Sequence, residues 1–248
     1  MIQIENVHKA FESQPVLRGL SCEVEKGEFL ALIGMSGSGK SVLLKHLAGM
    51  IHPDEGRIVL DGHDLAKIRG SDLENLRKRF GVVFQHGALF DSLTVYENIA
   101  FPLQEKTKLR QSEIREKVHQ QLEAVSLKNA EDKYPAEISG GMAKRTALAR
   151  ALITEPEIMF FDEPTTGLDP IIANSILKLF KSCHERFGFT GIIVSHDIPE
   201  VFDIVDRVAM LHEGVLIKAA PPSEFINSED ALIRQFITGS TEGPIQAN

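Results

Sequence analysis

Short runs of consecutive apolar residues recur along the chain and predict buried strands. The clearest run covers residues 29–33, and similar runs cover residues 82–84 and 158–161. A fourth predicted strand, residues 192–195, is apolar up to its last residue, Ser195. The first, third and fourth of these runs are each followed by residues with helical periodicity. Strands that are apolar at every position and alternate with helices indicate a parallel sheet that is covered on both faces. The pattern therefore predicts an α/β protein.

The N-terminal part follows a different pattern, in which apolar and polar residues partly alternate. Ile2, Ile4 and Val7 are apolar, and residues 20–24 show partial alternation. Residues 56–62 have the pattern of a strand that ends in an Asp-Gly turn. These features predict a β-rich beginning to the chain.

Three further stretches have the spacing of amphipathic helices. Residues 41–49 carry an apolar face, and helical periodicity dominates from about residue 92 to residue 156. Charged residues crowd positions 104–133, so this middle stretch differs in composition from its flanks. We interpret it as a helical lobe inserted into the sheet protein. Residues 229–236 are again amphipathic, and the polar tail after them is predicted to be poorly packed.

The composition argues against several classes of protein. The 248 residues include 27 Lys and Arg against 35 Asp and Glu, giving a net charge of −8, which argues against nucleic-acid binding through bulk charge. No apolar run approaches the roughly 18 residues of a membrane span, and the N-terminus lacks the pattern of a secretory signal. The two cysteines form no disulfide framework, so we expect a reducing cytoplasmic environment.

One glycine-rich loop carries the strongest chemical signal. It fits the pattern G-x-x-x-x-G-K-[ST] and lies between a predicted buried strand and a predicted helix, as this phosphate-binding motif requires. Glycines let backbone N–H groups surround phosphate oxygens, and the helix start adds further donors. Lys40 supplies a positive charge to the β- and γ-phosphates of a nucleotide such as ATP, and the Ser41 hydroxyl is a ligand for Mg²⁺. The predicted nucleotide-binding residues are Gly34, Met35, Ser36, Gly37, Ser38, Gly39, Lys40 and Ser41. The alternative is an ordinary Gly/Ser turn before a helix.

Two carboxylates follow a predicted buried strand. Asp162 and Glu163 come directly after four apolar residues, which places them at the carboxyl edge of the sheet, where α/β proteins bind ligands. Neighbouring strand residues point in opposite directions, so we expect two roles. Asp162 is predicted to hold Mg²⁺, and Glu163 is predicted to orient or deprotonate the attacking water. Alone, the pattern also fits a strand that leaves the core into solvent.

A second candidate anion site lies at residues 139–141. Ser139 is a natural N-cap, and Gly140 and Gly141 open a predicted helix that runs to about residue 153. A small, glycine-rich helix start attracts a phosphate group. The alternative is simply a capped helix.

Five motifs occur in a fixed order along nearly the whole chain: the phosphate loop and residues 139–141, 162–163, 167–169 and 195–197. In this order they resemble the nucleotide-binding subunit of ATP-binding cassette (ABC) transporters. The resemblance implies a P-loop NTPase core with a mostly parallel sheet, an N-terminal antiparallel β part and an inserted helical subdomain. Within one nucleotide-binding domain, residues 1–91 and 158–227 would form the core. Residues 92–157 would form the helical subdomain, and residues 228–248 a C-terminal helix and tail.

The resemblance also implies roles for single residues. Phe11 would stack on adenine, Gln85 would contact Mg²⁺ or water and signal to a membrane partner, His196 would contact the γ-phosphate, and Asp169 would contact the opposite subunit. Read alone, Phe11 could be core, Gln85 a surface residue and His196 structural. The family further implies a head-to-tail homodimer. Two anion sites in one chain, only one of them with a lysine, make sense if they complete each other across a two-fold axis.

A narrower resemblance concerns the partner. Residues 138–151 and 161–170 look like the ATPase of bacterial lipid-transport systems that use MCE proteins, with Met142 where many family members have Gln. Residues 233–245 also resemble that subgroup, whose C-terminal extension reaches over the neighbouring ATPase. The resemblance implies integral-membrane permease subunits, an MCE-domain protein, a small STAS-domain protein in some systems, phospholipid as substrate, and a peripheral location at the cytoplasmic face of the inner membrane.

Other functions stay open at this point. An ABC ATPase that serves amino acids, ions or solvents would keep the same chemistry and change only the partner. A soluble ABC-type ATPase of translation or DNA repair usually has two cassettes or long coiled coils, and neither is present in these 248 residues. A nucleotide sensor without catalysis is disfavoured because Lys40, Asp162, Glu163 and His196 are all present.

Overall fold

The computed structural model describes residues 1–246, so the last two residues of the predicted tail segment 228–248 lie outside the described residues. The chain forms two compact units. The first combines residues 1–73 with the chain from Ile192 onward, and the second is Glu74–Gly191. The predicted helical lobe, residues 92–157, falls within the second unit, which also contains two strands and the long helix α6 (Pro170–Phe187).

The first unit begins with an antiparallel sheet in the order β2-β1-β4-β5. Its strands are β1 (Ile2–Phe11), β2 (Gln14–Val24), β4 (Glu55–Leu60) and β5 (His63–Asp64). The pairing of β1 with β2 shifts register between Ile4 and Val7, at Asn6 with its positive φ of 47°. The irregularity lets Ile2, Ile4 and Val7 all face the core despite their uneven spacing.

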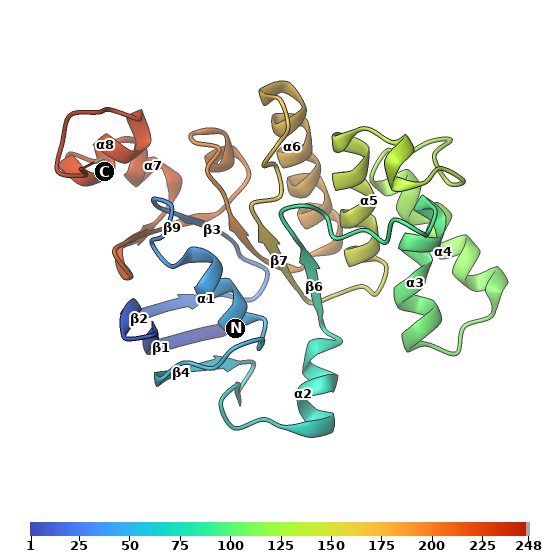
Figure 1. The fold of residues 1–248 in the computed structure, drawn as a ribbon, viewed down its shortest axis with the longest axis horizontal. Coiled ribbons are helices and arrows are strands. Elements are labelled where there is room, and N and C mark those ends of the chain that lie inside the picture. The colour runs from blue at the N-terminus through green and yellow to red at the C-terminus, as the bar shows by residue number, and fades with distance from the viewer. Residues whose placement is uncertain (247–248) are drawn as a thin grey trace. The chain divides into compact units, whose positions relative to one another are not determined.

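The same unit holds four strands of the second sheet, in the order β10-β9-β3-β8. They are β10 (Val215–Ala220), β9 (Arg207–His212), β3 (Phe29–Ile33) and β8 (Thr190–Val194), the last belonging to this unit from Ile192 onward. β3 runs parallel to β9 and is buried at every position, which confirms the predicted core strand. The helical elements are α1 (Lys40–Leu47), η2 (Glu200–Asp203), α7 (Pro222–Ile226) and α8 (Ala231–Thr238) (Figure 1).

The second unit pairs two parallel strands with a group of helices. β6 (Phe80–Val83) runs parallel to β7 (Ile158–Asp162). α5 (Gly140–Leu152) packs on β6, α3 (Val95–Lys106), α4 (Gln111–Ala124) and α6 (Pro170–Phe187) (Figure 1). The chain enters this unit through α2 (Gly70–Arg77), and η1 (Pro135–Glu137) precedes α5. The parallel pairs, the antiparallel N-terminal sheet and the helical group confirm the predicted fold class.

Local capping explains where several of these helices begin. The Thr94 side chain accepts a hydrogen bond from the Glu97 N–H, and the Glu97 carboxylate accepts one from the Thr94 N–H, so α3 begins with a capping box. Ser139, Asp169 and Asp230 cap α5, α6 and α8 in the same side-chain-to-backbone manner. The Ser139 cap was predicted from the sequence and is confirmed.

Candidate functional site

The phosphate loop leaves β3 and enters α1 through backbone conformations that only glycine adopts easily. Gly34 has a φ of +142°, and a Cβ there would lie 2.1 Å from the Leu211 carbonyl oxygen on β9. Gly39, the N-cap of α1, has a φ of +102°. The two glycines therefore let the loop pass directly against a neighbouring strand and then turn into the helix.

The Lys40 side chain folds back into this loop and bonds to its backbone. Its side chain is buried, and its Nζ donates to the carbonyl oxygens of Gly34 and Met35, each at 2.8 Å. The Ser38 N–H also donates to the Met35 carbonyl oxygen, at 3.1 Å. The ammonium group therefore sits inside a curled backbone, which is the arrangement that holds a phosphate in such loops.

The Ser38 hydroxyl indicates that a ligand completes the loop. Its Oγ is buried and has no hydrogen-bond partner among the described residues. A buried hydroxyl without a partner is unfavourable by roughly 1–3 kcal/mol, and a phosphate oxygen would accept its hydrogen bond. The residues present therefore fit a nucleotide phosphate.

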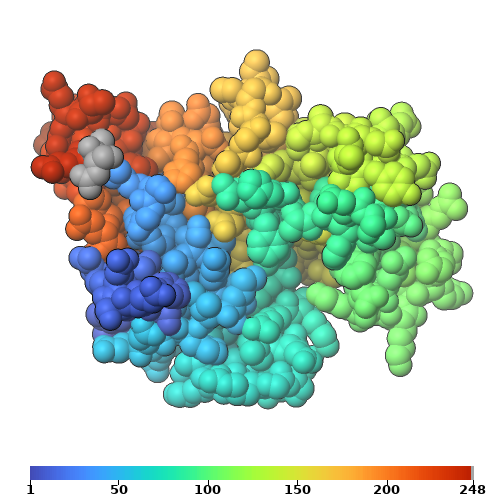
Figure 2. Space-filling model, viewed as in Figure 1, coloured from blue at the N-terminus to red at the C-terminus, as the bar shows by residue number. Residues whose placement is uncertain are grey.

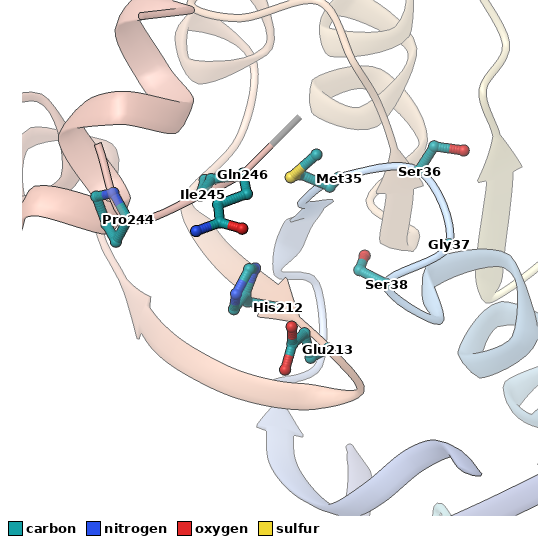
Figure 3. Close-up of a pocket in the computed structure, with 9 residues that line it drawn as sticks. All are labelled: Met35, Ser36, Gly37, Ser38, His212, Glu213, Pro244, Ile245 and Gln246. Carbon is teal, nitrogen blue, oxygen red and sulfur yellow. The ribbon is translucent and has the colours of Figure 1, made fainter. Parts of the chain in front are cut away.

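A pocket of about 430 Å³ borders the loop. Figure 3 shows its three sides: the loop with Met35 and Ser38, the β9–β10 turn with His212 and Glu213, and the C-terminal segment 244–246. In the space-filling view the red C-terminal segment lies beside blue atoms of the N-terminal part of the same unit (Figure 2). The tail of the chain thus reaches its own phosphate loop.

The prediction that the tail is poorly packed agrees with its exposure, since residues 239–246 are exposed except for the half-buried Ile245. One contact nevertheless attaches the tail to α8. Gln235 of α8 donates from Nε2 to the Ile245 carbonyl oxygen at 2.9 Å, and its Oε1 accepts from the Ile245 N–H at 2.7 Å. The Gln235 side chain is itself buried. The side-chain amide of Gln235 thus bonds both the N–H and the carbonyl oxygen of Ile245, as a backbone partner would. Hydropathy along the sequence does not reveal such a contact.

Two more predicted residues lie in the first unit. Phe11 ends β1 and is 46% exposed, with the Lys9 Nζ 5.4 Å from its ring centroid, so the interpretation as a core residue is wrong. His196 follows β8 and is also exposed, which disfavours a purely structural role. Beside it, the Ser195 Oγ accepts a hydrogen bond from the Asp197 N–H at 3.0 Å and shapes the turn.

The second unit holds the two carboxylates. β7 ends at Asp162, and Glu163 has a φ of +45°, in the left-handed region that few glutamates adopt. The prediction that strand alternation separates the two side chains is therefore wrong in its premise, because the chain turns at Glu163. Such a conformation is unfavourable by about 1–3 kcal/mol and is typical of active-site residues.

Gln85 contacts this carboxylate. Its Nε2 donates to the Glu163 Oε2 at 3.1 Å, and the residue is partly buried, so it is not an unattached surface glutamine. With the amide nitrogen turned to Glu163, the amide oxygen remains the group suited to a metal ion. The contact orients the carboxylate, and sequence spacing alone does not reveal it.

The start of α5 is a close-packed, capped helix. The Ser139 Oγ accepts from the Met142 N–H at 3.3 Å. A Cβ on Gly140 would lie 3.1 Å from the Leu168 Cδ2, and one on Gly141 would lie 2.9 Å from the Ile172 Cγ2. The glycines therefore allow the start of α6 to approach. The capped-helix interpretation is correct as far as this geometry goes, and the anion role stays a prediction.

Asp169 has a local role that the sequence analysis missed. Its Oδ1 accepts from the N–H groups of Ile171 and Ile172, each at 3.1 Å, and so caps α6. The Asp-Pro pair, with Pro170 at the first helical position, is the signal that could have shown it. Contact with an opposite subunit remains a prediction for this residue.

The proposed metal donors are Ser41, Gln85 and Asp162. All three offer oxygen atoms, which suit Mg²⁺. Among residues 1–246 no group of three or more His, Cys, Asp or Glu side chains could hold a metal by itself.

Comparison with known proteins shows the family of this chain. Residues 17–166 match the family described as ABC transporter. The chain belongs to the ABC transporter family. As an ABC ATPase it binds and hydrolyses ATP. None of its described helices has the length and apolar character needed to span a bilayer.

Relatives match this ABC ATPase over nearly its full length. It is 39% identical over 246 residues to MlaF of Haemophilus influenzae, the ATP-binding protein of an intermembrane phospholipid transport system, covering 99% of this chain and 93% of that one. It is also 39% identical to a Mycobacterium leprae protein named "Probable ribonucleotide transport ATP-binding protein mkl", covering 98% and 70%. A dimeric ATP-binding cassette solved in a post-hydrolysis state with ADP and Pi superposes with a TM-score of 0.81 and 30% identity, covering 90% and 99%.

Proposed function

We propose that this ABC ATPase is the ATP-hydrolysing subunit of a bacterial transporter that moves phospholipid between the inner and outer membranes. The supporting observation is the likeness to MlaF, which extends over 99% of this chain and therefore includes the segment after residue 227. The partners we assign are two permease subunits in the inner membrane, an MCE-domain protein and a small STAS-domain protein. The chain would sit at the cytoplasmic face and be attached through the permease.

The chemistry of the first unit suits nucleotide binding. Lys40 and the backbone N–H groups of the loop hold the β- and γ-phosphates, and the Ser38 hydroxyl gains an acceptor. Phe11, exposed at the end of β1, stacks on adenine. His196 contacts the γ-phosphate. A local cluster of N–H donors and one ammonium binds a polyphosphate strongly even on a chain with a net charge of −8.

The chemistry of the second unit suits hydrolysis. Glu163 accepts a proton from the attacking water, and the Gln85 amide holds one of its carboxylate oxygens. Mg²⁺, held by the oxygens of Ser41, Gln85 and Asp162, would neutralise charge on the phosphates.

A second copy of the chain supplies the remaining donors. The start of α5 has backbone N–H groups and a positive dipole end but offers no ammonium at its first turn, and its capped geometry is preformed. In the proposed head-to-tail homodimer, Ser139, Gly140 and Gly141 of one copy contact the γ-phosphate held by the loop of the other. Asp169 lies between Leu168 and Ile172, whose side chains approach Gly140 and Gly141, and it contacts the opposite subunit.

Glu163→Gln tests the catalytic assignment. The amide cannot take a proton, so we expect hydrolysis to fall by about 10²–10⁴-fold while ATP binding persists. Phosphate release and equilibrium binding of a fluorescent ATP analogue measure the two effects. Glu155→Gln, on an exposed glutamate of the same unit, is the control. Turnover of Glu163→Gln within tenfold of wild type would remove Glu163 from the mechanism.

Reconstitution tests the transported substrate. The chain is purified from detergent-solubilised membranes with its permease and placed in vesicles beside acceptor vesicles. We expect ATP-dependent movement of labelled phospholipid, which Glu163→Gln should abolish, and we expect phospholipid in the lipid extract of the purified complex. The competing function is transport of another substrate, favoured by the similarly identical relative named for ribonucleotide transport. If an added ribonucleotide other than ATP stimulated the ATPase and no lipid moved, that result would favour the alternative.

A further inference from the structure

A lysine is buried in the middle of the second unit, on the helix that begins at Ser139. Lys144 is only 6% exposed, although its neighbours in the sequence include the more accessible Arg145. Burial of an ammonium group without an anionic partner is strongly unfavourable. A side chain kept in such a position needs a reason other than packing, since an apolar residue of the same length would pack without this penalty.

The partner of Lys144 is a main-chain carbonyl. Its Nζ donates to the Gln85 carbonyl oxygen, and no carboxylate bonds to it among the residues that the structure describes. Burial without an anionic partner lowers the pKa of Lys144 from its ordinary value. A charged donor on a neutral carbonyl gives a strong and directional hydrogen bond.

Gln85 joins this lysine to the catalytic carboxylate. Its main-chain oxygen accepts from Lys144, and its side-chain Nε2 donates to the Glu163 Oε2 at 3.1 Å. One residue therefore stands between α5 and the base. The main chain of Gln85 contacts Lys144, and its side chain contacts Glu163. A displacement of the Gln85 backbone therefore moves the amide that holds Glu163.

Arg150 fixes the following residues of the same segment. Its guanidinium donates to the carbonyl oxygens of Gly87 and Ala88, each at 2.8 Å, and lies 5.8 Å from the Phe90 ring centroid. α5 thus holds the backbone of residues 85–90 at two places, one turn and a half apart along the helix. Arg150 sets the far end of the segment, and Lys144 sets the end that carries Gln85.

We propose that Lys144 is a positioning residue for hydrolysis, which holds Gln85 so that the Gln85 amide aligns the Glu163 carboxylate with its water. Lys144 lies on the helix whose start is proposed to bind a phosphate, and it reaches the base of the same chain through Gln85. α5 therefore links the proposed phosphate site to Glu163. This inference rests on the proposed role of Glu163 and adds a residue that does not touch ATP.

Lys144→Met tests the proposal, because methionine is an unbranched side chain only one atom shorter than lysine and lacks the donor. We expect kcat at saturating ATP to fall about tenfold, the ATP dissociation constant to stay within twofold, and the Tm to stay equal or rise because a buried charge is gone. A structural role predicts the reverse, with a lower Tm and unchanged kcat per folded molecule. Lys144→Arg keeps a donor and should recover kcat to within threefold of wild type.

Thr146→Val is the matched control on the same helix. Thr146 is buried, and its Oγ1 donates only to the Met142 carbonyl oxygen of α5 itself, at 2.9 Å. It should leave kcat unchanged. A kcat for Lys144→Met within twofold of wild type, or a folded Lys144→Arg as slow as Lys144→Met, overturns the proposal. If Glu163→Gln also hydrolyses ATP normally, the proposed role of Glu163 fails first; if only the lysine variants are normal, the inference about Lys144 alone fails.

Discussion

Two helix starts in this ABC ATPase, both proposed to bind phosphate, are built in different ways. α1 begins at a glycine with a φ of +102°, has no side-chain cap, and carries Lys40 as its first residue. α5 begins at Ser139, whose hydroxyl caps it, and its glycines serve close contact with Leu168 and Ile172. The first start contains its own cation, and the second offers only N–H groups and a helix dipole.

In the proposed head-to-tail homodimer, this difference explains why one chain needs a second copy. A helix dipole and a few N–H donors contribute about 0.3–2 kcal/mol, whereas a buried ammonium on a phosphate contributes more and brings the charge that a triphosphate requires. We therefore propose that the loop before α1 holds ATP alone. On the same proposal, the start of α5 gains enough affinity only when a nucleotide bound by the other copy is brought to it.

The largest expected difference between the two helix starts is the loss in the free energy of unfolding when a glycine at each is replaced by alanine. In Gly34→Ala the Cβ would meet the Leu211 carbonyl at 2.1 Å in a conformation that alanine rarely adopts. We expect a loss of at least about 3 kcal/mol in the free energy of unfolding. In Gly141→Ala the Cβ meets only a side-chain methyl at 2.9 Å, so the loss should be under about 1 kcal/mol. Urea denaturation measures both, and equal losses would contradict the comparison.

Lys40→Ala removes the cation from the first start. We expect ATP affinity to fall about 100-fold, which corresponds to about 2.7 kcal/mol, because no other ammonium is provided by the loop. Lys45→Ala, on an exposed lysine of the same helix, should bind ATP normally. Fluorescence titration with an ATP analogue gives both constants. Unchanged affinity for Lys40→Ala would show that the loop binds through backbone groups alone.

Ser139→Ala removes the cap from the second start. The Met142 N–H loses its acceptor, so we expect the chain to be destabilised by about 1 kcal/mol. ATP binding to the isolated chain should be unaffected, while hydrolysis at dimer-forming concentrations falls several-fold. Tm and steady-state ATPase measure these effects. Weaker ATP binding by Ser139→Ala would mean that α5 contributes to the nucleotide of its own chain.

The smallest effect concerns pH and the buried end of α1. His46 is buried, its Nδ1 donates to the Val42 carbonyl oxygen at 2.7 Å, and its Nε2 has no partner among the described residues. Burial lowers its pKa below the ordinary value near 6.5. The unfolded chain therefore binds a proton more readily, so stability is full above about pH 6.5 and decreases as the pH falls below it. His46→Gln should reduce the Tm difference between pH 7.5 and 5.5, whereas His63→Gln, on an exposed histidine, should not.

Much of the machinery was predictable because its signals are local. The run at residues 29–33 is β3 itself, and the helix predicted from Ser139 is α5 with bounds Gly140–Leu152. Apolar runs, caps and the glycine spacing of the loop depend on neighbouring residues, and local chemistry determines them. The order of the five motifs added the family.

The sequence alone therefore determined that this chain has a phosphate loop, buried parallel strands and a capped second helix start, since each follows from residues a few positions apart. Only the tertiary structure decided that Glu163 adopts a φ of +45°, that Gln85 holds it, and that Lys144 holds Gln85. It also decided that the Gln235 side chain on α8 binds the backbone of the tail at Ile245. Most of these contacts join residues about 60 to 80 positions apart, or ten in the tail, and a buried hydrogen bond leaves no periodic pattern along the chain.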